Sequence, residues 1–458
     1  MLKGKRVLLG VTGGIAAYRA AELARMLTRE GAEVRVAMTA AACEFVQPLT
    51  FQALCGHPVM LSLFDQQEES QIGHIAAARW PDCIVVAPAT ANFIGKAAGG
   101  IADDLLTTIV MASRKPVVLA PAMNWAMWQN EFVQANLARL TALERFQIVP
   151  PEEGEMACGE TGKGRLATLD FIIDRVVYAS REEKDLHDET VLITSGPTYE
   201  DIDPVRFVAN RSSGKMGFAL AREARARGGR VILIAGPNSL IPPCDVQVVP
   251  VRTAAQMLEA VRKHAPEANV IIKAAAVADF RPARTADRKI HKDEGDFSLP
   301  LVKTVDILSE LGQSKRHNQF LVGFAAETHQ VMTYGSQKLR EKRLDLIVVN
   351  DVSEEGAGFE VDTNVVKVID NAGHIEQWPM MPKAKVAVML FDLIQKHRAN
   401  QKGPDKGRDG HSVRPSHRPG GGRRRRSKRG GGGGGGGGGE SRGGEGRANG
   451  GNPEGQPA

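Results

Sequence analysis

The sequence predicts two α/β domains, each with a Rossmann-like, doubly wound parallel sheet, followed by a disordered tail. The chain has 458 residues, more than one hydrophobic core usually covers. Short apolar runs, such as residues 6–11, 83–88 and 117–121, alternate with stretches of helical apolar spacing. This alternation is typical of a parallel sheet covered by helices on both faces. The pattern restarts after a charged stretch at residues 180–189, which indicates a second domain.

The first predicted domain covers residues 1–189. Its expected elements are a strand at 6–11, a tight turn at 12–14, a helix at 15–30 and strands at 34–38, 83–88 and 117–121. The turn is predicted from Thr12-Gly13-Gly14, and the last two strands stop at Pro88 and Pro121. Ligands of such sheets bind beyond the carboxyl ends of the strands, so the loops that follow them are the candidate site.

The second predicted domain covers residues 190–399 and repeats the strand–helix–strand pattern. Its expected elements are strands at 191–195 and 231–235 around a helix at 216–227, then strands at 270–275, 320–324 and 346–349. The chain has no short-period repeat, so the halves are two different domains and not a solenoid.

The third segment, residues 400–458, is predicted to be disordered because it is rich in Gly and Arg and has no aromatic residue. The whole chain has 59 Lys and Arg and 53 Asp and Glu, of which this tail holds thirteen and five. Residues 1–399 therefore carry a net charge of −2. A basic tail without aromatic side chains predicts only weak, nonspecific contact with polyanions.

No apolar run approaches the roughly 20 residues that span a bilayer, and the first residues lack the apolar core of a signal peptide. We therefore expect a cytoplasmic protein with no membrane partner. The five cysteines contain no CxxC pair, which argues against a disulfide framework or a structural zinc site.

Residues at the expected strand ends of the first domain suit a phosphate-bearing ligand. Gly13 and Gly14 open a helix whose free amides attract an anion, and Thr39 follows the second strand. Thr90 and Asn92 follow the next strand, where they can bind a ligand, cap a helix or do both. The full GxGxxG pattern is absent, so a dinucleotide is not favoured.

Three further residues of this domain are candidates for chemistry. Asn124 in PAMN and Cys158 in ACGETGKGR lie on loops of small residues, and His74 lies on a predicted helix. A cytosolic cysteine among glycines suits a chemical role, although such turns also carry idle cysteines. A solitary histidine is more often structural or at the surface.

Taken together, these motifs resemble the flavin-containing cysteine decarboxylases, in particular the phosphopantothenoylcysteine decarboxylases. The resemblance rests on GVTGGIAAYRA, IGHIAAARWPD, APATANFIGKAAGGIADDLL, PAMN and ACGETGKGR, in this order. It implies a flavodoxin-like domain that binds flavin mononucleotide (FMN), with Gly13, Gly14, Ile15 and Thr39 near the phosphate and Thr90 and Asn92 nearby. It further implies that His74 acts in proton transfer or positioning, that Asn124 holds the departing carboxylate and that Cys158 donates a proton.

The implied reaction needs such a cofactor. Loss of CO2 from a C-terminal cysteine leaves a carbanion that nothing delocalises, whereas prior oxidation of the thiol to a thioaldehyde supplies an electron sink. A flavin provides that oxidant and later returns the hydride. Cys158 would then donate the proton that completes reduction of the aminoenethiol.

The second domain carries a polar loop, DPVRFVANRSSGKMG, that leads into a predicted helix. Lys215 is followed by Met and no GxxxxGK[ST] pattern exists, so a P-loop is disfavoured. A capping loop would explain the serines but not Arg206 together with Asn210. Lysines near several expected strand ends would suit a triphosphate if they converge.

This half resembles the phosphopantothenate-cysteine ligases of the cytidylate-forming, bacterial type, mainly through DPVRFVANRSSGKMGFALA and GFAAET. The resemblance implies that CTP, with Mg²⁺, activates 4'-phosphopantothenate as an acyl cytidylate that the amine of cysteine attacks. Asn210 would stabilise that intermediate, Arg206 would assist its phosphate or carboxyl end, and Lys289 would assist amide formation. The implied CTP contacts are Lys273, Ala274, Ala275, Asp279, Lys289, Val305, Asp306, Ile307, Leu308, Phe324, Lys338 and Lys342. Val305 and His291 depart from the usual motif.

The two resemblances together cover residues 1–397 and imply a bifunctional enzyme of coenzyme A biosynthesis. They imply three small-molecule substrates, 4'-phosphopantothenate, cysteine and CTP, and a homo-oligomer of decarboxylase trimers and ligase dimers. Two alternatives stay open. In the first alternative, only one of the two halves is an active enzyme. In the second, the chain is a flavin-binding scaffold protein that binds partners through its basic tail.

Overall fold

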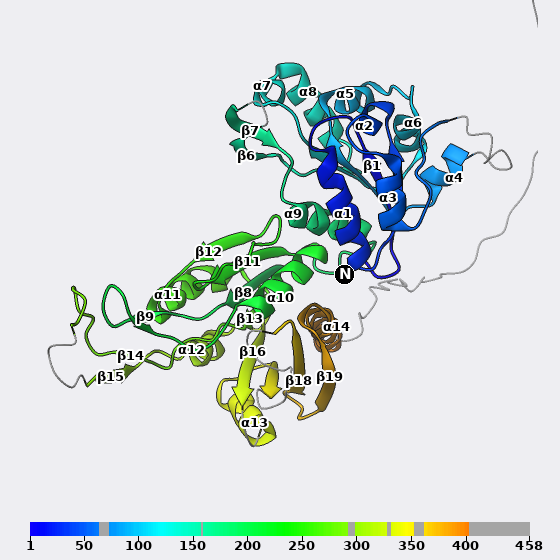
Figure 1. Cartoon of the computed structure of the whole chain (residues 1–458). Coiled ribbons are helices and arrows are strands. Elements are labelled where there is room, and N and C mark those ends of the chain that lie inside the picture. The colour runs from blue at the N-terminus through cyan, green and yellow to red at the C-terminus, as the bar shows by residue number, and fades with distance from the viewer. Residues whose placement is uncertain (64–72, 157–158, 292–297, 328–330, 352–360, 403–458) are drawn as a thin grey trace, which may run out of the picture. The chain divides into compact units, whose positions relative to one another are not determined.

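The computed structural model describes residues 1–63, 73–156, 159–291, 298–327, 331–351 and 361–402 (Figure 1). Its strands form two main sheets, the first within residues 6–148 and the second within residues 190–382. The predicted tail lies outside the described residues from residue 403 on.

The first sheet has five parallel strands in the order β2-β1-β3-β4-β5, the order of flavodoxin-like folds. The strands are β1 (Arg6–Val11), β2 (Glu33–Met38), β3 (Cys83–Ala89), β4 (Val117–Pro121) and β5 (Phe146–Ile148). Their sequences are almost continuously apolar because both faces are buried. Leu8 packs into the core on one side of the sheet, and Val7 and Leu9 pack on the other.

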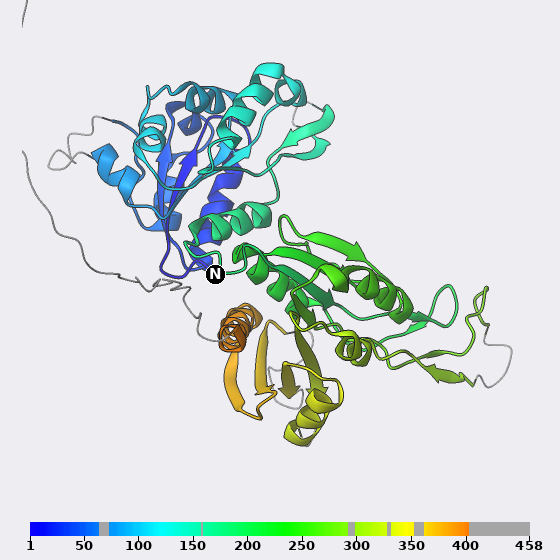
Figure 2. The ribbon, with the colours of Figure 1, turned by 180° about the vertical axis from the view of Figure 1, so that it is seen from behind.

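Helices cover both faces of this sheet (Figure 1 and Figure 2). The core on the side of Val7 includes side chains of α1 (Ala17–Arg29), α3 (Pro48–Cys55) and α9 (Leu169–Ser180). The core on the side of Leu8 includes side chains of α4 (Gly73–Arg79), α5 (Ala91–Gly99), α6 (Leu105–Ala112) and α8 (Glu131–Thr141). Two short helices, α2 (Ala40–Cys43) and α7 (Trp125–Gln129), follow β2 and β4 at the carboxyl edge of the sheet.

A two-stranded hairpin, β6 (Glu152–Glu155) and β7 (Thr161–Arg165), stands apart from the first sheet. It docks on the loop after β4, where the amide of Met123 donates to the carbonyl oxygen of Gly164 at 3.0 Å. A Cβ atom added at Gly164 would lie 2.2 Å from the carbonyl oxygen of Met123, so only glycine permits this approach.

The second sheet has eight strands in the order β12-β11-β8-β13-β16-β17-β18-β19. They are β8 (Thr190–Ser195), β11 (Arg230–Ala235), β12 (Gln247–Pro250), β13 (Val270–Lys273), β16 (Phe320–Glu327), β17 (Leu346–Asp351), β18 (Thr363–Asp370) and β19 (Ile375–Pro382). The six strands from β12 to β17 are parallel, in the Rossmann order 3-2-1-4-5-6, and the last two are antiparallel.

Helices also cover both faces of the second sheet. Val191 and Ile193 face a core that includes α10 (Lys215–Ala226) and α14 (Lys383–Lys402). Leu192 faces the opposite core, with α11 (Ala254–His264), α12 (Ile307–Ser314) and α13 (Val331–Glu341). The short 3-10 helix η2 (Ala265–Glu267) continues from α11. Two small antiparallel pairs lie outside the sheet, β9 (Glu200–Asp201) with β10 (Phe207–Val208) and β14 (Phe280–Pro282) with β15 (Leu301–Lys303).

The predicted fold class, two doubly wound α/β domains, is confirmed by these sheets. The strands predicted at residues 6–11 and 117–121 have the observed bounds. α1 begins at Ala17 instead of residue 15, because the turn after β1 extends through Ala16. The hairpin β6–β7 and the antiparallel edge strands β18 and β19 were not predicted.

Candidate functional site

A cavity of about 1400 Å³ opens at the carboxyl ends of β1, β3 and β4. All of the residues predicted to lie near the flavin line it, namely Gly13, Gly14, Ile15, Thr39, Thr90 and Asn92. Asn124 lines the same cavity, from the loop after β4. The fold therefore brings together residues that are up to 111 positions apart in the sequence.

The start of α1 is one wall of this first cavity. No described side chain caps the helix, so the amides of its first turn lack a capping acceptor. A Cβ atom at Gly13 would lie 2.4 Å from the Cβ of Ala41, whereas one at Gly14 would make an ordinary 3.6 Å contact with Thr90. An uncapped helix start beside a loop this compact suits a phosphate group.

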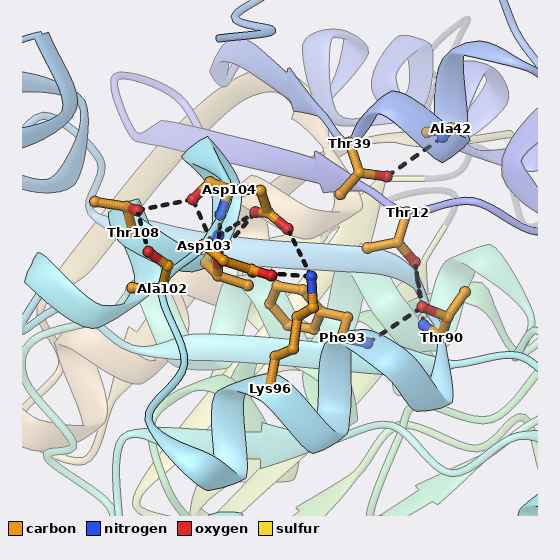
Figure 3. Close-up of polar contacts among 11 residues, drawn as sticks. Thr12, Thr39, Ala42, Thr90, Phe93, Lys96, Ala102, Asp103, Asp104 and Thr108 are labelled. Carbon is orange, nitrogen blue, oxygen red and sulfur yellow. Dashed lines mark hydrogen bonds and ion pairs between the residues drawn. The ribbon is translucent and has the colours of Figure 1, made fainter. Parts of the chain in front are cut away.

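Threonine hydroxyls connect the loops around the first cavity (Figure 3). Thr12 Oγ1 donates to the carbonyl oxygen of Pro88 at 2.7 Å and lies 3.2 Å from Thr90 Oγ1. Thr90 caps α5 and Thr39 caps α2, each by accepting a backbone N–H of the first turn. The capping role that the sequence left open is thus confirmed for Thr90, and Asn92 lies within α5.

Three charged residues that sequence analysis did not single out also line the first cavity. Lys96 Nζ lies 2.8 Å from Asp103 Oδ1 and 3.6 Å from Asp104 Oδ2 (Figure 3). The hydrogen bond with Asp103 raises the pKa of Lys96 and lowers the pKa of Asp103. Charged residues at helix ends are usually solvated, so their type alone does not predict a place in a cavity. The only indication in the sequence is that they lie in a segment of small and apolar residues, GKAAGGIADD.

Asn124 joins the first cavity to the hairpin β6–β7. Its Oδ1 accepts the backbone N–H of Ala126 at 2.8 Å and so caps α7. Its Nδ2 donates to Glu160 Oε2 at 2.8 Å, and Trp125 Nε1 donates to the same oxygen at 3.0 Å. Sequence analysis missed this pairing because Glu160 is 36 residues from Asn124.

The other two residues predicted to act in decarboxylation are not brought to this cavity by the described structure. His74 lies on α4 and is not among the residues that line the cavity. Cys158 lies outside the described residues. The roles of both residues therefore stay predictions.

A second cavity, of about 670 Å³, opens at the carboxyl ends of β13, β16 and β17 and at the start of α10. Every predicted CTP contact except Lys289 lines it: Lys273, Ala274, Ala275, Asp279, Val305, Asp306, Ile307, Leu308, Phe324, Lys338 and Lys342. Cavities of this size are typical of small-molecule sites.

Three lysines, Lys273, Lys338 and Lys342, line the second cavity together with the carboxylate of Asp306. Lys342 Nζ lies 2.8 Å from Asp306 Oδ2, and Lys273 Nζ donates to the carbonyl oxygen of Ala275 at 2.9 Å. Burial, and then the nearby charge of Lys342, lowers the pKa of Lys273 to about 8. With Lys338, the group has an excess of positive charge, as expected of a site for a polyphosphate.

The residues predicted to catalyse ligation are divided between two places. Asn210 lines the second cavity and donates to the carbonyl oxygen of Val277 at 2.9 Å. Arg206 and Lys289 do not line it. Arg206 donates to the carbonyl oxygen of Ile290 at 2.6 Å, so Arg206 lies beside the segment that carries Lys289.

Arg206 is also paired with Asp203, which is fully buried. Its guanidinium donates to Asp203 Oδ2 from Nε at 2.9 Å and from Nη2 at 2.6 Å. Burial alone would raise the pKa of Asp203, but the bonds from Arg206 and from nearby backbone amides lower it. This pair holds the loop between β9 and β10.

Several polar residues of the second cavity were not predicted as contacts, and three of them, Asn350, Asn364 and Lys383, come from distant segments. Lys215 at the start of α10 pairs with Asp362 at 2.7 Å. Asn350, Asn364 and Lys383 line the cavity from β17, from β18 and from the start of α14. Because β18 was not predicted, nothing in the sequence indicated that Asn364 or Lys383 lies at the second cavity.

The described ranges contain no group of three or more His, Cys, Asp or Glu side chains placed to hold a metal ion. No helix within those ranges is long and apolar enough to cross a membrane.

The fold and the two cavities define a class, a tandem pair of α/β domains in which each sheet carries its own small-molecule site. Two family models match the chain. The model described as Flavoprotein matches residues 1–180, and the DNA/pantothenate metabolism flavoprotein C-terminal domain matches residues 186–397.

Two solved structures are each similar to one half of the chain. The C-terminal domain of a coenzyme A biosynthesis bifunctional protein CoaBC is 42% identical and covers 47% of this chain and 98% of that domain, with a TM-score of 0.41. The FMN binding protein AtHal3 is 35% identical and covers 38% of this chain and 95% of that protein, with a TM-score of 0.34.

Curated relatives match over nearly their whole length. The coenzyme A biosynthesis bifunctional protein CoaBC of Bacillus subtilis (strain 168) is 48% identical, over 88% of this chain and 98% of the relative. The protein of the same name from Escherichia coli (strain K12) is 43% identical, over 86% of this chain and 97% of the relative. The chain belongs to the CoaBC family of bifunctional coenzyme A biosynthesis proteins.

Proposed function

We propose that this chain, a bifunctional enzyme of coenzyme A biosynthesis, makes 4'-phosphopantetheine in two reactions. The second domain joins 4'-phosphopantothenate to cysteine at the expense of CTP, through an acyl cytidylate. The first domain then removes CO2 from the amide product with bound FMN. One observation carries the proposal: two separate cavities, one on each sheet, collect the predicted flavin contacts together with Asn124 and, except for Lys289, the predicted CTP contacts together with Asn210.

The residues of the first cavity fit FMN. The start of α1, which no described side chain caps, the compact turn at Gly13 and the loop at Thr39 would hold its phosphate. Thr90 and Asn92 would contact the remainder of the cofactor from the start of α5. Bound FMN supplies reversible two-electron oxidation of the substrate thiol.

In the decarboxylase, three residues would act on the substrate itself. Asn124 would orient the carboxylate that leaves, because its amide N–H groups are donors at the wall of the cavity. His74 would move or position a proton during oxidation. Cys158 would donate the proton that completes reduction of the aminoenethiol.

In the ligase, the positive charge of Lys273, Lys338 and Lys342 would bind the triphosphate of CTP, accompanied by Mg²⁺. A carboxylate is a poor electrophile, and its conversion to a mixed anhydride with CMP supplies a leaving group. Asn210 would stabilise that anhydride from within the cavity. Arg206 and Lys289, which lie together outside its lining, would assist the anhydride and the amide-forming step.

We also propose that the chain forms a homo-oligomer, with decarboxylase trimers and ligase dimers. Exposed apolar side chains near both cavities support this. Ile15 and Tyr18 are 61% and 64% exposed beside the first cavity, and Val305, which lines the second cavity, is 56% exposed. Burial of such side chains in an interface is favourable. His74, which does not line the cavity of its own chain, would reach that of a neighbouring copy.

We place both reactions in the cytoplasm, where CTP and reduced thiols are present. Four of the cysteines, Cys43, Cys55, Cys83 and Cys244, are free in the described residues, which suits a reducing compartment. Contact of the basic tail with polyanions stays a prediction.

The proposal is tested by mass spectrometry of the products. Purified protein, which should be yellow, is incubated with 4'-phosphopantothenate, cysteine, CTP and Mg²⁺. We expect CMP, pyrophosphate and 4'-phosphopantetheine. If the reaction stops at 4'-phosphopantothenoylcysteine in flavin-loaded protein, the decarboxylase assignment is wrong, and if CTP is not consumed, the ligase assignment is wrong.

A further inference from the structure

The carboxylate of Glu160 accepts hydrogen bonds from two donors, Asn124, which lines the first cavity, and the neighbouring Trp125. Its Oε2 accepts from Asn124 Nδ2 at 2.8 Å and from Trp125 Nε1 at 3.0 Å. The orientation of the Asn124 amide is determined by its Oδ1, which accepts the backbone N–H of Ala126 at 2.8 Å. The N–H groups of Asn124 therefore point toward a carboxylate that belongs to the protein itself.

Contacts that do not involve the side chain of Glu160 also hold the hairpin on the loop after β4. Strand β7, which follows this residue, is held by the bond from the Met123 amide to the Gly164 carbonyl oxygen at 3.0 Å. A Cβ atom added at Gly162 would lie 2.8 Å from the Cβ of Trp125, which shows how closely β7 packs on this loop. Glu160 itself is exposed. Its side chain can therefore leave Asn124 by rotation while the hairpin stays docked.

Substrate and product of the proposed decarboxylation differ by a single carboxylate. If Asn124 holds that carboxylate, a second one at the same donors is opposed by like-charge repulsion. Substrate must therefore displace Glu160 before it can bind in the reactive position. The displacement is easy, because hydrogen bonds and ion contacts of exposed side chains contribute little to stability. Once CO2 has left, Glu160 can return and satisfy both donors again.

We propose that Glu160 is a specificity-determining residue that exchanges with the substrate carboxylate on Asn124. This inference rests on the proposed role of Asn124. The exchange weakens the binding of ligands that carry the carboxylate and leaves ligands without it unaffected. When CO2 leaves, Glu160 accepts again from Asn124 and Trp125, so neither donor stays unpaired. The exchange therefore favours binding of the decarboxylated ligand over binding of the substrate.

The test compares two ligands that differ only by the carboxylate. They are 4'-phosphopantothenoylserine and 4'-phosphopantothenoylethanolamine, in which a hydroxyl replaces the thiol so that neither is oxidised. Each is titrated into flavin-loaded, full-length protein, and binding is followed by the flavin absorbance, which does not report on the second domain. The measured quantity is the Kd of the ethanolamine ligand divided by the Kd of the serine ligand.

We expect Glu160→Ala to raise this ratio about fivefold, mainly through tighter binding of the serine ligand, since an exposed charge-assisted contact is lost. Glu160→Gln keeps an acceptor oxygen but no charge, and should give an intermediate ratio. Glu153→Ala removes a similar side chain from the exposed part of the same hairpin, and should leave the ratio unchanged. If Glu160→Ala fails to retain flavin, the inference is tested by the Kd ratio of Glu160→Gln, which should exceed that of wild type.

Two results would overturn the inference, and they are distinguishable. An unchanged ratio in Glu160→Ala, or equal weakening of both ligands, means that Glu160 only supports the hairpin. Asn124→Ala should lower the ratio in a protein that retains Glu160. If Asn124→Ala leaves the ratio unchanged, the role of Asn124 in the proposed function is wrong, and the exchange fails with it.

Discussion

Lys342 Nζ lies 2.8 Å from Oδ2 of Asp306, the residue that caps α12. The other oxygen of Asp306 accepts the backbone N–H of Ser309 at 3.0 Å. One carboxylate thus holds a helix start and a lysine at the wall of the second cavity. The two functions of this carboxylate can be separated by mutation.

Lys342→Met should raise the KM for CTP at least tenfold and change the free energy of unfolding by less than about 1 kcal/mol, because the ion pair is partly exposed. Asp306→Ala removes the cap as well, and should lower the free energy of unfolding by about 1 kcal/mol. Ligase kinetics and urea unfolding measure the two effects. An unchanged KM for CTP in Lys342→Met would exclude this lysine from the nucleotide site.

The half-buried Lys273 should make the stability of the protein depend on pH. Its pKa is about 8 in the folded chain, against an ordinary value of 10.5. Between these values the unfolded chain binds more protons, so the free energy of unfolding rises with pH. Below pH 8 the charge on Lys273 lowers the free energy of unfolding by at most about 3.4 kcal/mol, at 1.36 kcal/mol for each pKa unit.

The measurement is the difference in free energy of unfolding between wild type and Lys273→Met, from urea titrations at pH 7 to 10.5. We expect the variant to gain stability relative to wild type at pH 7, and the difference to shrink as the pH rises above 8. The affinity for CTP should fall over the same range in wild type only, because a neutral lysine attracts a triphosphate less. Parallel stability curves for the two proteins would show that Lys273 does not titrate in this range.

Gly13 and Gly14 should respond differently to the same substitution. A Cβ atom at Gly13 would clash with Ala41 at 2.4 Å, whereas one at Gly14 meets only Thr90 at 3.6 Å. Gly13→Ala should therefore lose most of its bound flavin, and Gly14→Ala should keep it with modestly lower affinity. Flavin absorbance per chain after gel filtration measures both. Equal retention in the two variants would contradict the proposed phosphate site at this turn.

Cys158→Ser should still release CO2 but stop before the final reduction, because a serine hydroxyl is a much weaker acid than a thiol. The aminoenethiol should accumulate and the yield of saturated product should fall at least tenfold. Mass spectrometry distinguishes the two species by two hydrogens. A normal yield of 4'-phosphopantetheine would rule out Cys158 as the proton donor.

Lys289→Gln should slow the second half of ligation and leave the first half intact. Pyrophosphate should still form from CTP and 4'-phosphopantothenate, and the acyl cytidylate should accumulate before cysteine attacks. Rapid-quench measurements of pyrophosphate and of the amide separate the two steps. Asn210→Asp, which alters a residue within the cavity, should instead reduce accumulation of the intermediate. Unchanged amide formation in Lys289→Gln would refute its role.

The central strands of both sheets could be predicted because their apolar runs are buried on both faces, as at Leu8 and Val7. The hairpin β6–β7 could not be predicted from the sequence. Its sequences, EEGE and TGKGR, have neither apolar alternation nor a two-residue turn, and the glycines serve close packing on Trp125 and Met123. Strands β18 and β19 pair antiparallel with a parallel sheet, and no local pattern indicates such a partner.

The same distinction applies to the sites. Gly13, Thr39 and Thr90 could be predicted because each follows a recognisable strand of one sheet, and the carboxyl ends of parallel strands meet at one edge. The contact of Glu160 with Asn124 and the place of Lys383 in the second cavity could not be predicted, because each depends on long-range packing. Arg206 and Lys289 were expected to act in ligation, and the structure places both outside the lining of the second cavity.

The most direct test of the account is the release of labelled CO2 from cysteine that carries ¹⁴C in its carboxyl group. Flavin-loaded, full-length protein is incubated with the labelled cysteine and 4'-phosphopantothenate, with and without CTP. We predict stoichiometric ¹⁴CO2 that depends on both CTP and 4'-phosphopantothenate. Release without CTP, or no release when CTP is consumed, would contradict two coupled reactions in one chain.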